Sequence, residues 1–185
     1  SGENIIAELR ACGVPCVQLS GNYRQSDRSS ALYENVRDYD EIHSVYDLRR
    51  DGSFDIVPME DDYIAFAVTK LAISPAVSGG MPVILSPFTD KTDIGVKALN
   101  EVMQSLTCTS DRARLGGFFE GDKVMFTVNN WQKGYINGTT GVLRCNPPAV
   151  DTDSGDSIPL DEQDVANLTL AYALSIHKAQ GSGFD

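Results

Sequence analysis

The sequence lacks the features that mark membrane and secreted proteins. No stretch approaches the roughly 18 uninterrupted apolar residues that a membrane-spanning helix needs. The N-terminal SGENIIAELR has acidic and polar residues where a secretory signal carries a basic and then an apolar run. We therefore expect a cytoplasmic protein with no membrane partner. Its 185 residues, 42% of them hydrophobic, suffice for one sizeable core with at most a small appendage.

Cysteine and basic residues are also scarce. The four cysteines have no C-x-x-C spacing and lie far in sequence from both histidines, so we expect reduced thiols and no metal site (Cys12, Cys16, Cys108 and Cys145; His43 and His177). The 15 Lys and Arg against 26 Asp and Glu give a net charge of -11, which argues against a nonspecific nucleic-acid binder held by a basic face. Six of the acids lie in DTDSGDSIPLDEQD, residues 151–164, so a groove elsewhere could still be neutral or positive.

A third absence concerns nucleotides. The sequence contains no G-x-x-x-x-G-K-[ST] pattern, the glycine-rich loop that cradles nucleotide phosphates in many ATP-binding proteins. This absence excludes a chain that binds and hydrolyses ATP through such a loop of its own.

Strand-like and helical segments alternate over the first 111 residues. A short apolar run at 14–20 predicts a buried strand, and a second such strand is predicted within MPVILSPF, residues 81–88. Helical periodicity predicts helices from Ser26 or Asp27 onward, from 60 to Pro75, and from Thr92 to about 106. This alternation predicts an α/β fold in which a parallel sheet carries helices on both faces.

From about Arg112 the pattern changes to short β-branched and aromatic runs between turn signals. The strongest hairpin signal is Asn137-Gly138, because both residues tolerate positive φ. An apolar strand at 168–174 then returns the chain to the first lobe. We therefore expect a small β unit at 112–163, inserted into an α/β lobe made of 1–111 and 164–185.

Two predicted strands end in polar residues. LSGNYRQS, residues 19–26, places Tyr23 beside Arg24, a ring that can stack on a base and a guanidinium that can pair with phosphate oxygens. LSIHKAQGSGFD, residues 174–185, empties into Ser, His, Lys, Gln and glycines. Open α/β sheets bind ligands at such strand ends. Taken alone, an arginine there is more typical of a surface ion pair.

Four segments, in their order and spacing, resemble the C-terminal motor half of RecD/TraI-type superfamily-one DNA helicases. They are LSGNYRQS, VILSPFTDKTDIGVKALNEVMQ, GDKVMFTVNNWQKGYINGTTGVL and LAYALSIHKAQGSGFD. The resemblance covers essentially the whole chain. It implies that the α/β lobe is a second RecA-like lobe of the P-loop NTPase type, and that the β unit is an inserted SH3-like barrel beside a single-strand channel.

The resemblance also implies roles for individual residues. NYRQ matches a motif whose Tyr stacks on adenine and whose Arg contacts the γ-phosphate, which assigns Tyr23, Arg24 and Gln25 to nucleotide and Arg24 to catalysis. SIHKAQGSGF matches a motif that touches the DNA strand and couples it to the nucleotide, which implies the DNA contacts Ser175, His177, Lys178 and Gln180 and the nucleotide contact Gly181. Gly183 replaces the Glu that the family usually has near the ATP ribose.

Other residues could line the DNA path. In the β unit, Asn130, Trp131 and Lys133 could stack on and pair with a single strand, as aromatic and basic groups do in such channels. Trp131 could equally lie in the barrel core. The residues Pro87, Phe88 and Thr89 follow another strand end and could line the channel, although loop packing is the more usual explanation for such residues.

These observations lead to one main expectation and two alternatives. The parent is expected to be an ATP- and Mg²⁺-dependent DNA helicase acting on single-stranded DNA, in an exodeoxyribonuclease V-like enzyme with helicase-nuclease partner subunits. The chain is expected to be a fragment that does not hydrolyse ATP alone, because the phosphate loop and the Mg²⁺ ligand belong to a first motor lobe. The alternatives are a noncatalytic protein- or peptide-binding module, and a relaxase-helicase or viral-type helicase.

Overall fold

The computed structural model describes residues 11–13, 30–52, 54–74, 82–90, 93–107 and 111–180. Contacts divide the chain into two units, Ser1–Pro58 and Met59–Asp185. No helix in the described ranges is long and apolar enough to cross a membrane.

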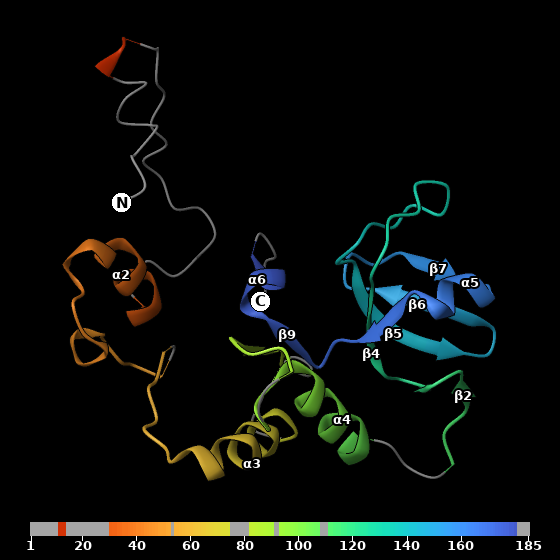
Figure 1. Cartoon of the computed structure of the whole chain (residues 1–185), viewed down its shortest axis with the longest axis horizontal. Coiled ribbons are helices and arrows are strands. Elements are labelled where there is room, and N and C mark those ends of the chain that lie inside the picture. Colours follow the sequence, from red (N-terminus) through yellow and green to blue (C-terminus); the bar gives the residue numbers. More distant parts are fainter. Residues whose placement is uncertain are drawn as a thin grey trace. The chain divides into compact units, whose positions relative to one another are not determined.

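The first unit is built around helix α2 (Ala31–Arg37) and the short 3₁₀ helices η1 (Tyr39–Glu41) and η2 (Val45–Asp47), drawn in orange in Figure 1. Helix α2 begins after Ser30, whose hydroxyl accepts a hydrogen bond from the backbone N–H of Tyr33 at 3.2 Å. The expected caps Ser26 and Asp27 lie outside the described residues. The buried amide of Asn35 donates to the carbonyl of Arg49 at 3.0 Å and accepts from its N–H at 2.8 Å. These bonds fold the following segment back onto the helix.

One part of the second unit has an α/β structure and consists of residues 59–107 and 171–180. It contains α3 (Asp61–Ala72), β1 (Ile84–Ser86), α4 (Val96–Thr107), β9 (Ala173–Ser175) and α6 (Ile176–Ala179). Strands β1 and β9 pair in parallel, so the predicted α/β class with parallel strands is confirmed. The helices predicted within 60–75 and 92–106 are present, and α4 buries Leu99 and Met103 against β9 as its periodicity predicts. One detail differs, because Leu85 in β1 is 47% exposed and the strand is not covered on both faces by described residues.

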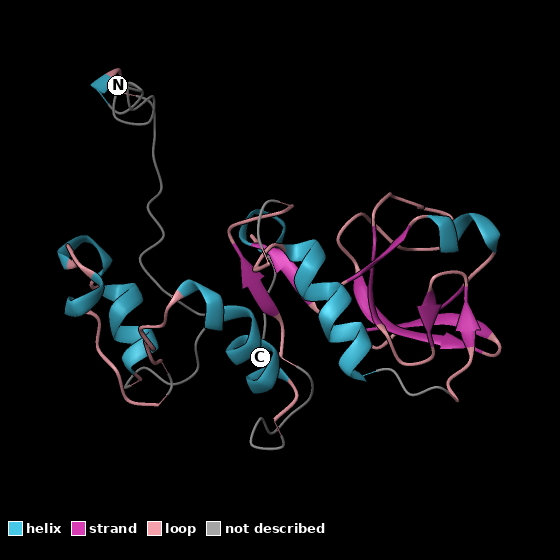
Figure 2. Cartoon of the chain, turned by 60° about the horizontal axis from the view of Figure 1, so that its bottom comes forward, coloured by secondary structure: helices cyan, strands magenta, loops and turns pink. Residues whose placement is uncertain are grey.

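The β part, residues 111–170, contains short strands like those predicted from about Arg112, and these strands pair antiparallel. A short hairpin of β2 (Arg114–Leu115) and β3 (Phe118–Phe119) precedes a five-stranded sheet with the order β7-β6-β5-β4-β8. The sheet consists of β4 (Lys123–Phe126), β5 (Thr140–Cys145), β6 (Pro148–Thr152), β7 (Ser157–Pro159) and β8 (Leu168–Leu170). Along the chain, helix α5 (Glu162–Ala166) connects β7 to β8. Figures 1 and 2 show the sheet with this helix. No described strand pairs β7 with β8, so the sheet is open and the expected closed SH3-like barrel is not found.

The apolar run at 168–174 was predicted as a single strand of the α/β lobe. The structure splits it instead. Leu170 in β8 lies opposite Val124 of β4, in the antiparallel sheet, and Leu174 in β9 lies opposite Leu85 of β1, in the parallel pair. The change occurs at the buried Ala171 and Tyr172. A continuous apolar run predicts a buried strand but does not indicate which sheet each residue joins.

A buried carboxylate fastens the two parts together. Asp122, fully buried just before β4, accepts hydrogen bonds from the Tyr172 hydroxyl at 2.8 Å, from the Gln104 amide at 2.6 Å and from the backbone N–H of Phe119 at 2.9 Å. Gln104 lies on α4 and Tyr172 lies between β8 and β9. The charge is thus stabilised by donors from both parts.

Candidate functional site

Of the two predicted polar strand ends, the structure describes the one after β9, and it lies beside the end of β1. Because β1 and β9 are parallel and Ser86 is in register with Ser175, both strands end at the same edge of the sheet. The loop 87–90 leaves from β1 and helix α6 leaves from β9. This is the arrangement in which α/β sheets place ligand-binding groups.

Buried hydroxyl and backbone contacts hold the loop after β1. The Ser86 hydroxyl donates to the carbonyl of Ile94 at 2.6 Å and accepts from the N–H of Phe88 at 3.1 Å. The carbonyls of Phe88 and Thr89 accept hydrogen bonds from Val96 and from Lys97 in the first turn of α4. The loop is therefore packed against α4 by its backbone, while its side chains at 87–89 are exposed. Both expectations for this loop, packing and availability to a ligand, are compatible with that geometry.

Helix α6 presents the polar residues that follow β9. The Ser175 hydroxyl accepts the N–H of Lys178 at 3.2 Å, so this side chain caps the helix. Ala179 is buried and anchors the turn. His177, Lys178 and Gln180 are exposed, and the residues described here make no ion pair with Lys178.

A groove of about 380 Å³ runs beside this edge, between the α/β part and the β part. Its lining comes from the loop after β1, the first turns of α4, one residue of β3, strand β8 and helix α6 (Thr89, Asp90, Val96, Lys97, Asn100, Glu101, Phe118, Leu168, Thr169, Leu170 and Lys178). A smaller pocket of about 60 Å³ adjoins it and is lined in addition by Met125, Ala173, Leu174 and Ser175. Two lysines and two acids line the groove, so it is formally neutral in a chain that carries an excess of acid.

The loop between β4 and β5 carries the other residues proposed for DNA. The backbones of Asn130 and Tyr135 bond to each other across the loop, and the Asn130 side-chain oxygen accepts the N–H groups of Gln132 and Lys133 at 3.2 Å. Trp131 stands at this turn with 78% of its surface exposed, so it is not a core residue. On the other side of the turn, the buried Tyr135 stacks its ring on Phe126 with centroids 3.8 Å apart, which anchors the loop.

Lys133 is held by two carboxylates of the α5 region. Its ammonium donates to Asp161 at 2.6 Å and to Asp164, whose side chain is only 3% exposed. Tyr135 also donates to Asp164, at 2.5 Å. The hydrogen bond from Lys133 lowers the pKa of Asp161 to about 2, and the same contacts raise the pKa of Lys133 above its usual value. Lys133 is therefore a poorer candidate for a phosphate contact than Lys178.

The residues proposed for nucleotide lie outside the described part of the chain. These are Tyr23, Arg24, Gln25 and Gly181, together with the Gly183 position. The expected convergence of Arg24 with the His177 loop accordingly stays a prediction. In the ranges that the structure describes, no three His, Cys, Asp or Glu side chains form a group that could hold a metal ion.

Buried polar residues that no motif in the sequence marks organise the site from inside. Asn100, buried on α4, donates to the carbonyl of Ala173 at 3.0 Å and accepts from its N–H at 2.9 Å, which pins α4 to β9 next to the groove. Asp122 and Asp164 act similarly in the β part. One signal was available for Asn100, because it follows Leu99 on the apolar face of a strongly periodic helix.

Comparison with known proteins agrees with the class that the motifs indicated, the RecD-type superfamily-one helicases. The chain is 28% identical over 181 residues to the ATP-dependent RecD2 DNA helicase of Deinococcus radiodurans, which confirms the resemblance. The match covers 93% of this chain but only 24% of the relative, so the chain spans about a quarter of that protein's length. No family model matches the chain.

Among solved structures, the chain is similar to Pif1 helicases. Pif1 from Bacteroides bound to single-stranded DNA is 19% identical with a TM-score of 0.48, covering 91% of this chain and 44% of that one. The Bacteroides Pif1 complex with ADP-AlF3 and single-stranded DNA is 20% identical with the same TM-score, covering 89% and 43%.

Proposed function

We propose that this chain is the second motor lobe of an ATP-dependent DNA helicase and that it binds single-stranded DNA along the groove beside α6. The similarity to RecD2 supports the class. The observation that carries the proposal is the parallel register of β1 and β9, which brings the loop after Ser86 and the exposed Lys178 to one groove. We extend the proposal to a parent that works with other subunits, as in an exodeoxyribonuclease V-like enzyme.

The groups around the groove suit a nucleic-acid backbone. Lys178 and Lys97 can neutralise phosphates, while Ser175, His177, Gln180 and Thr89 offer hydrogen bonds to phosphate and sugar. Outside the groove lining, Trp131 on the β4–β5 loop is fixed by Asn130 and Tyr135 and offers a π-face on which a base can stack. Because Asp90 and Glu101 offset the two lysines, the lone lobe binds weakly and its binding weakens further with salt.

The nucleotide half of the proposal rests on the NYRQ motif. In it, Tyr23 stacks on adenine, Gln25 and Gly181 lie against the nucleotide, and Arg24 neutralises charge at the γ-phosphate. Mg²⁺ and the phosphate loop belong to the first motor lobe. Replacing Arg24 with Ala in the two-lobe parent should preserve nucleotide binding and abolish most hydrolysis, and replacing His177 with Ala should remove the stimulation of ATPase by DNA. Turnover near wild type in the first variant would refute the role of Arg24.

The direct test is fluorescence anisotropy of a labelled oligodeoxythymidine titrated with this chain at low salt. Lys178→Gln should weaken binding by roughly three- to tenfold and reduce the salt slope by about 1. Lys70→Gln is the matched control, because Lys70 is an exposed lysine on α3 that does not line the groove. No binding by the wild-type chain at low salt, or equal losses in both variants, would remove the groove from the proposal.

A further inference from the structure

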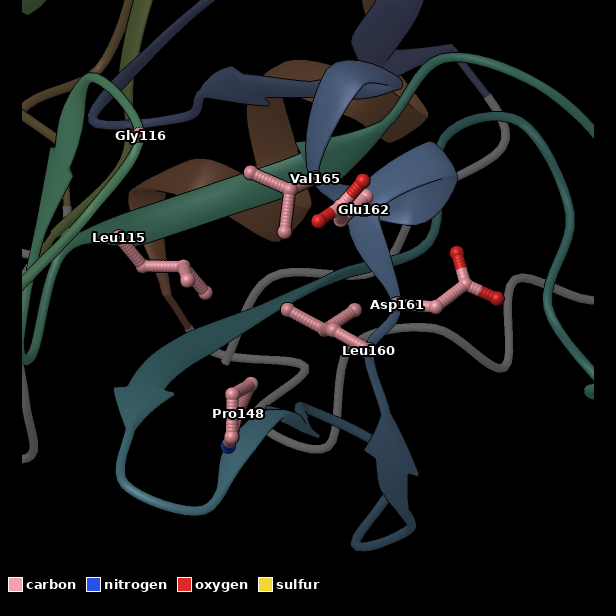
Figure 3. Close-up of a pocket in the computed structure, with 7 residues that line it drawn as sticks. All are labelled: Leu115, Gly116, Pro148, Leu160, Asp161, Glu162 and Val165. Atoms are coloured by element: carbon pink, nitrogen blue, oxygen red, sulfur yellow. The ribbon is translucent and has the colours of Figure 1, made fainter.

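A second concavity lies in the β part and shares no lining residue with the groove. It encloses about 480 Å³ between the β2–β3 hairpin, the start of β6 and the α5 region. In Figure 3 the side chains of Leu115, Leu160 and Val165 surround one space, with Pro148 closing it on another side. Gly116, Asp161 and Glu162 complete the lining. We call this concavity the Leu160 pocket.

Packing beneath the Leu160 pocket makes it a preformed feature. Leu115 and Leu160 are half-buried and pack against the core of the β sheet, so the floor is continuous with that core. Gly116 has φ +62°, and a Cβ there would lie 3.3 Å from Val165 Cγ1, so glycine lets the hairpin turn close to the helix. Little side-chain ordering therefore remains to be done when a ligand enters.

The rim beside α5 is acidic. Its two carboxylates belong to Asp161, which is paired with Lys133, and to Glu162, whose side chain makes no hydrogen bond or ion pair with the residues that the structure describes. Both lie within the acidic segment 151–164. A phosphate chain would be repelled here, whereas an arginine or lysine next to an apolar side chain would be attracted.

We propose that the Leu160 pocket docks a protein segment in which a leucine-sized side chain adjoins a basic residue. The apolar side chain enters between Leu115, Leu160 and Val165, and the basic side chain pairs with Glu162. A concavity of about 480 Å³ with few polar groups has the size of a ligand-binding site, so it can hold the anchor side chain together with the peptide backbone beside it. The proposal does not depend on the helicase function, and it places the protein-binding activity that the sequence left as an alternative on a specific surface.

The test uses the whole chain and a short fluorescein-labelled peptide of alternating leucine and arginine, followed by anisotropy. Replacing the peptide's leucines with serine should weaken binding at least about tenfold, because the anchor burial is lost. In the chain, Glu162→Gln should weaken binding roughly two- to fivefold at low salt. Gln163→Lys is the matched control, since it changes the net charge by the same amount on the same helix but does not line the pocket. Val165→Phe should narrow the pocket between Leu115 and Leu160 and weaken binding while circular dichroism stays unchanged.

Three results would overturn the proposal. The first is equal binding of the leucine and serine peptides, which would reduce the interaction to charge. The second is equal loss in Glu162→Gln and Gln163→Lys together with normal binding by folded Val165→Phe. The third is displacement of the peptide by oligodeoxythymidine combined with tighter oligonucleotide binding by Glu162→Gln, which would make the pocket a nucleic-acid site.

Discussion

At the scale of single residues, Lys133 is a charged side chain whose ion pairs stabilise the fold. Its ammonium is the cation for Asp164, a carboxylate that is almost fully buried and that also receives the Tyr135 hydroxyl. Removing one partner from a buried charge is costly because the other is left uncompensated. The ion pair therefore fastens the loop carrying Trp131 to α5.

We predict that Lys133→Gln lowers the urea midpoint of unfolding, since the buried Asp164 loses its charged donor. Lys97→Gln, an exposed lysine without a described ion pair, should change stability by less than about 0.5 kcal/mol. If Lys133→Gln were as stable as the wild type and instead lost DNA affinity, Lys133 would be a DNA contact and not a structural cation.

Alkaline pH should expose the role of Tyr172. Burial raises the pKa of Tyr172 to about 12, and its hydrogen bond to Asp122 adds to this. A tyrosine in the unfolded chain ionises near its usual pKa of about 10, so the unfolded state loses its proton first. Stability is therefore fully present below about pH 10 and is lost as pH rises toward 12. The raised pKa of Lys133 acts in the same direction.

The measurement is the urea midpoint as a function of pH from 8 to 11. Tyr172→Phe should start lower, because Asp122 loses a donor, and should then fall less steeply above pH 10. Tyr46→Phe is a suitable control, since Tyr46 is 84% exposed. Identical slopes in the wild type and Tyr172→Phe would contradict the assignment.

At the scale of elements, the periodicity of apolar residues predicted the helices, because local sequence largely determines where a helix forms. Helices α3 and α4 lie where the spacing of apolar residues predicted them. The parallel pairing of β1 and β9 was predicted from the alternation of strands and helices along the chain. The exposed positions of His177, Lys178 and Gln180 after a buried strand were also predictable, because a polar run after an apolar strand marks its end.

Two element-level features could not be predicted from the sequence. The division of 168–174 between β8 and β9 depends on partners in β4 and β1 that are distant in sequence, and both halves look alike as apolar residues. The open β sheet could not be predicted either, because turn signals and alternation fix strands but not whether the end strands meet. The same holds for Lys133, whose partners Asp161 and Asp164 were seen only as part of an acidic run.

The contact between α4 and β9 yields a prediction at this scale. Asn100→Ala should destabilise the chain by about 1–3 kcal/mol, because the N–H and carbonyl of Ala173 both lose their side-chain partner in a buried position. Hydrogen exchange at the Ala173 amide should accelerate together with this loss. Glu101→Ala, an exposed neighbour on the same helix, should leave both unchanged. Unaltered exchange at Ala173 in Asn100→Ala would show that Asn100 does not hold β9.

At the scale of the whole second unit, the α/β part and the β part are joined by a continuous chain from β8 to β9 and by the Asp122 cluster. Asp122 joins the two parts by hydrogen bonds, since its donors come from α4, β3 and the β8–β9 connection. The groove proposed for DNA lies between the same two parts. Its shape therefore depends on their being held in one arrangement.

Replacing Asp122 should loosen that arrangement. We predict that Asp122→Asn costs about 2–4 kcal/mol, because an amide nitrogen in place of either oxygen would face a donor from Gln104, Phe119 or Tyr172. In the wild type, amides of α4 and β4 should exchange through the same unfolding event, whereas in Asp122→Asn the β4 amides should exchange faster than those of α4. Asp90→Asn, an exposed carboxylate in the groove, should keep the wild-type exchange pattern.

Because the groove needs both walls, Asp122→Asn should also weaken oligodeoxythymidine binding at least as much as Lys178→Gln. If α4 and β4 stay coupled in Asp122→Asn, the cohesion of the two parts comes from the apolar residues at 170–174, and the carboxylate is not what joins them.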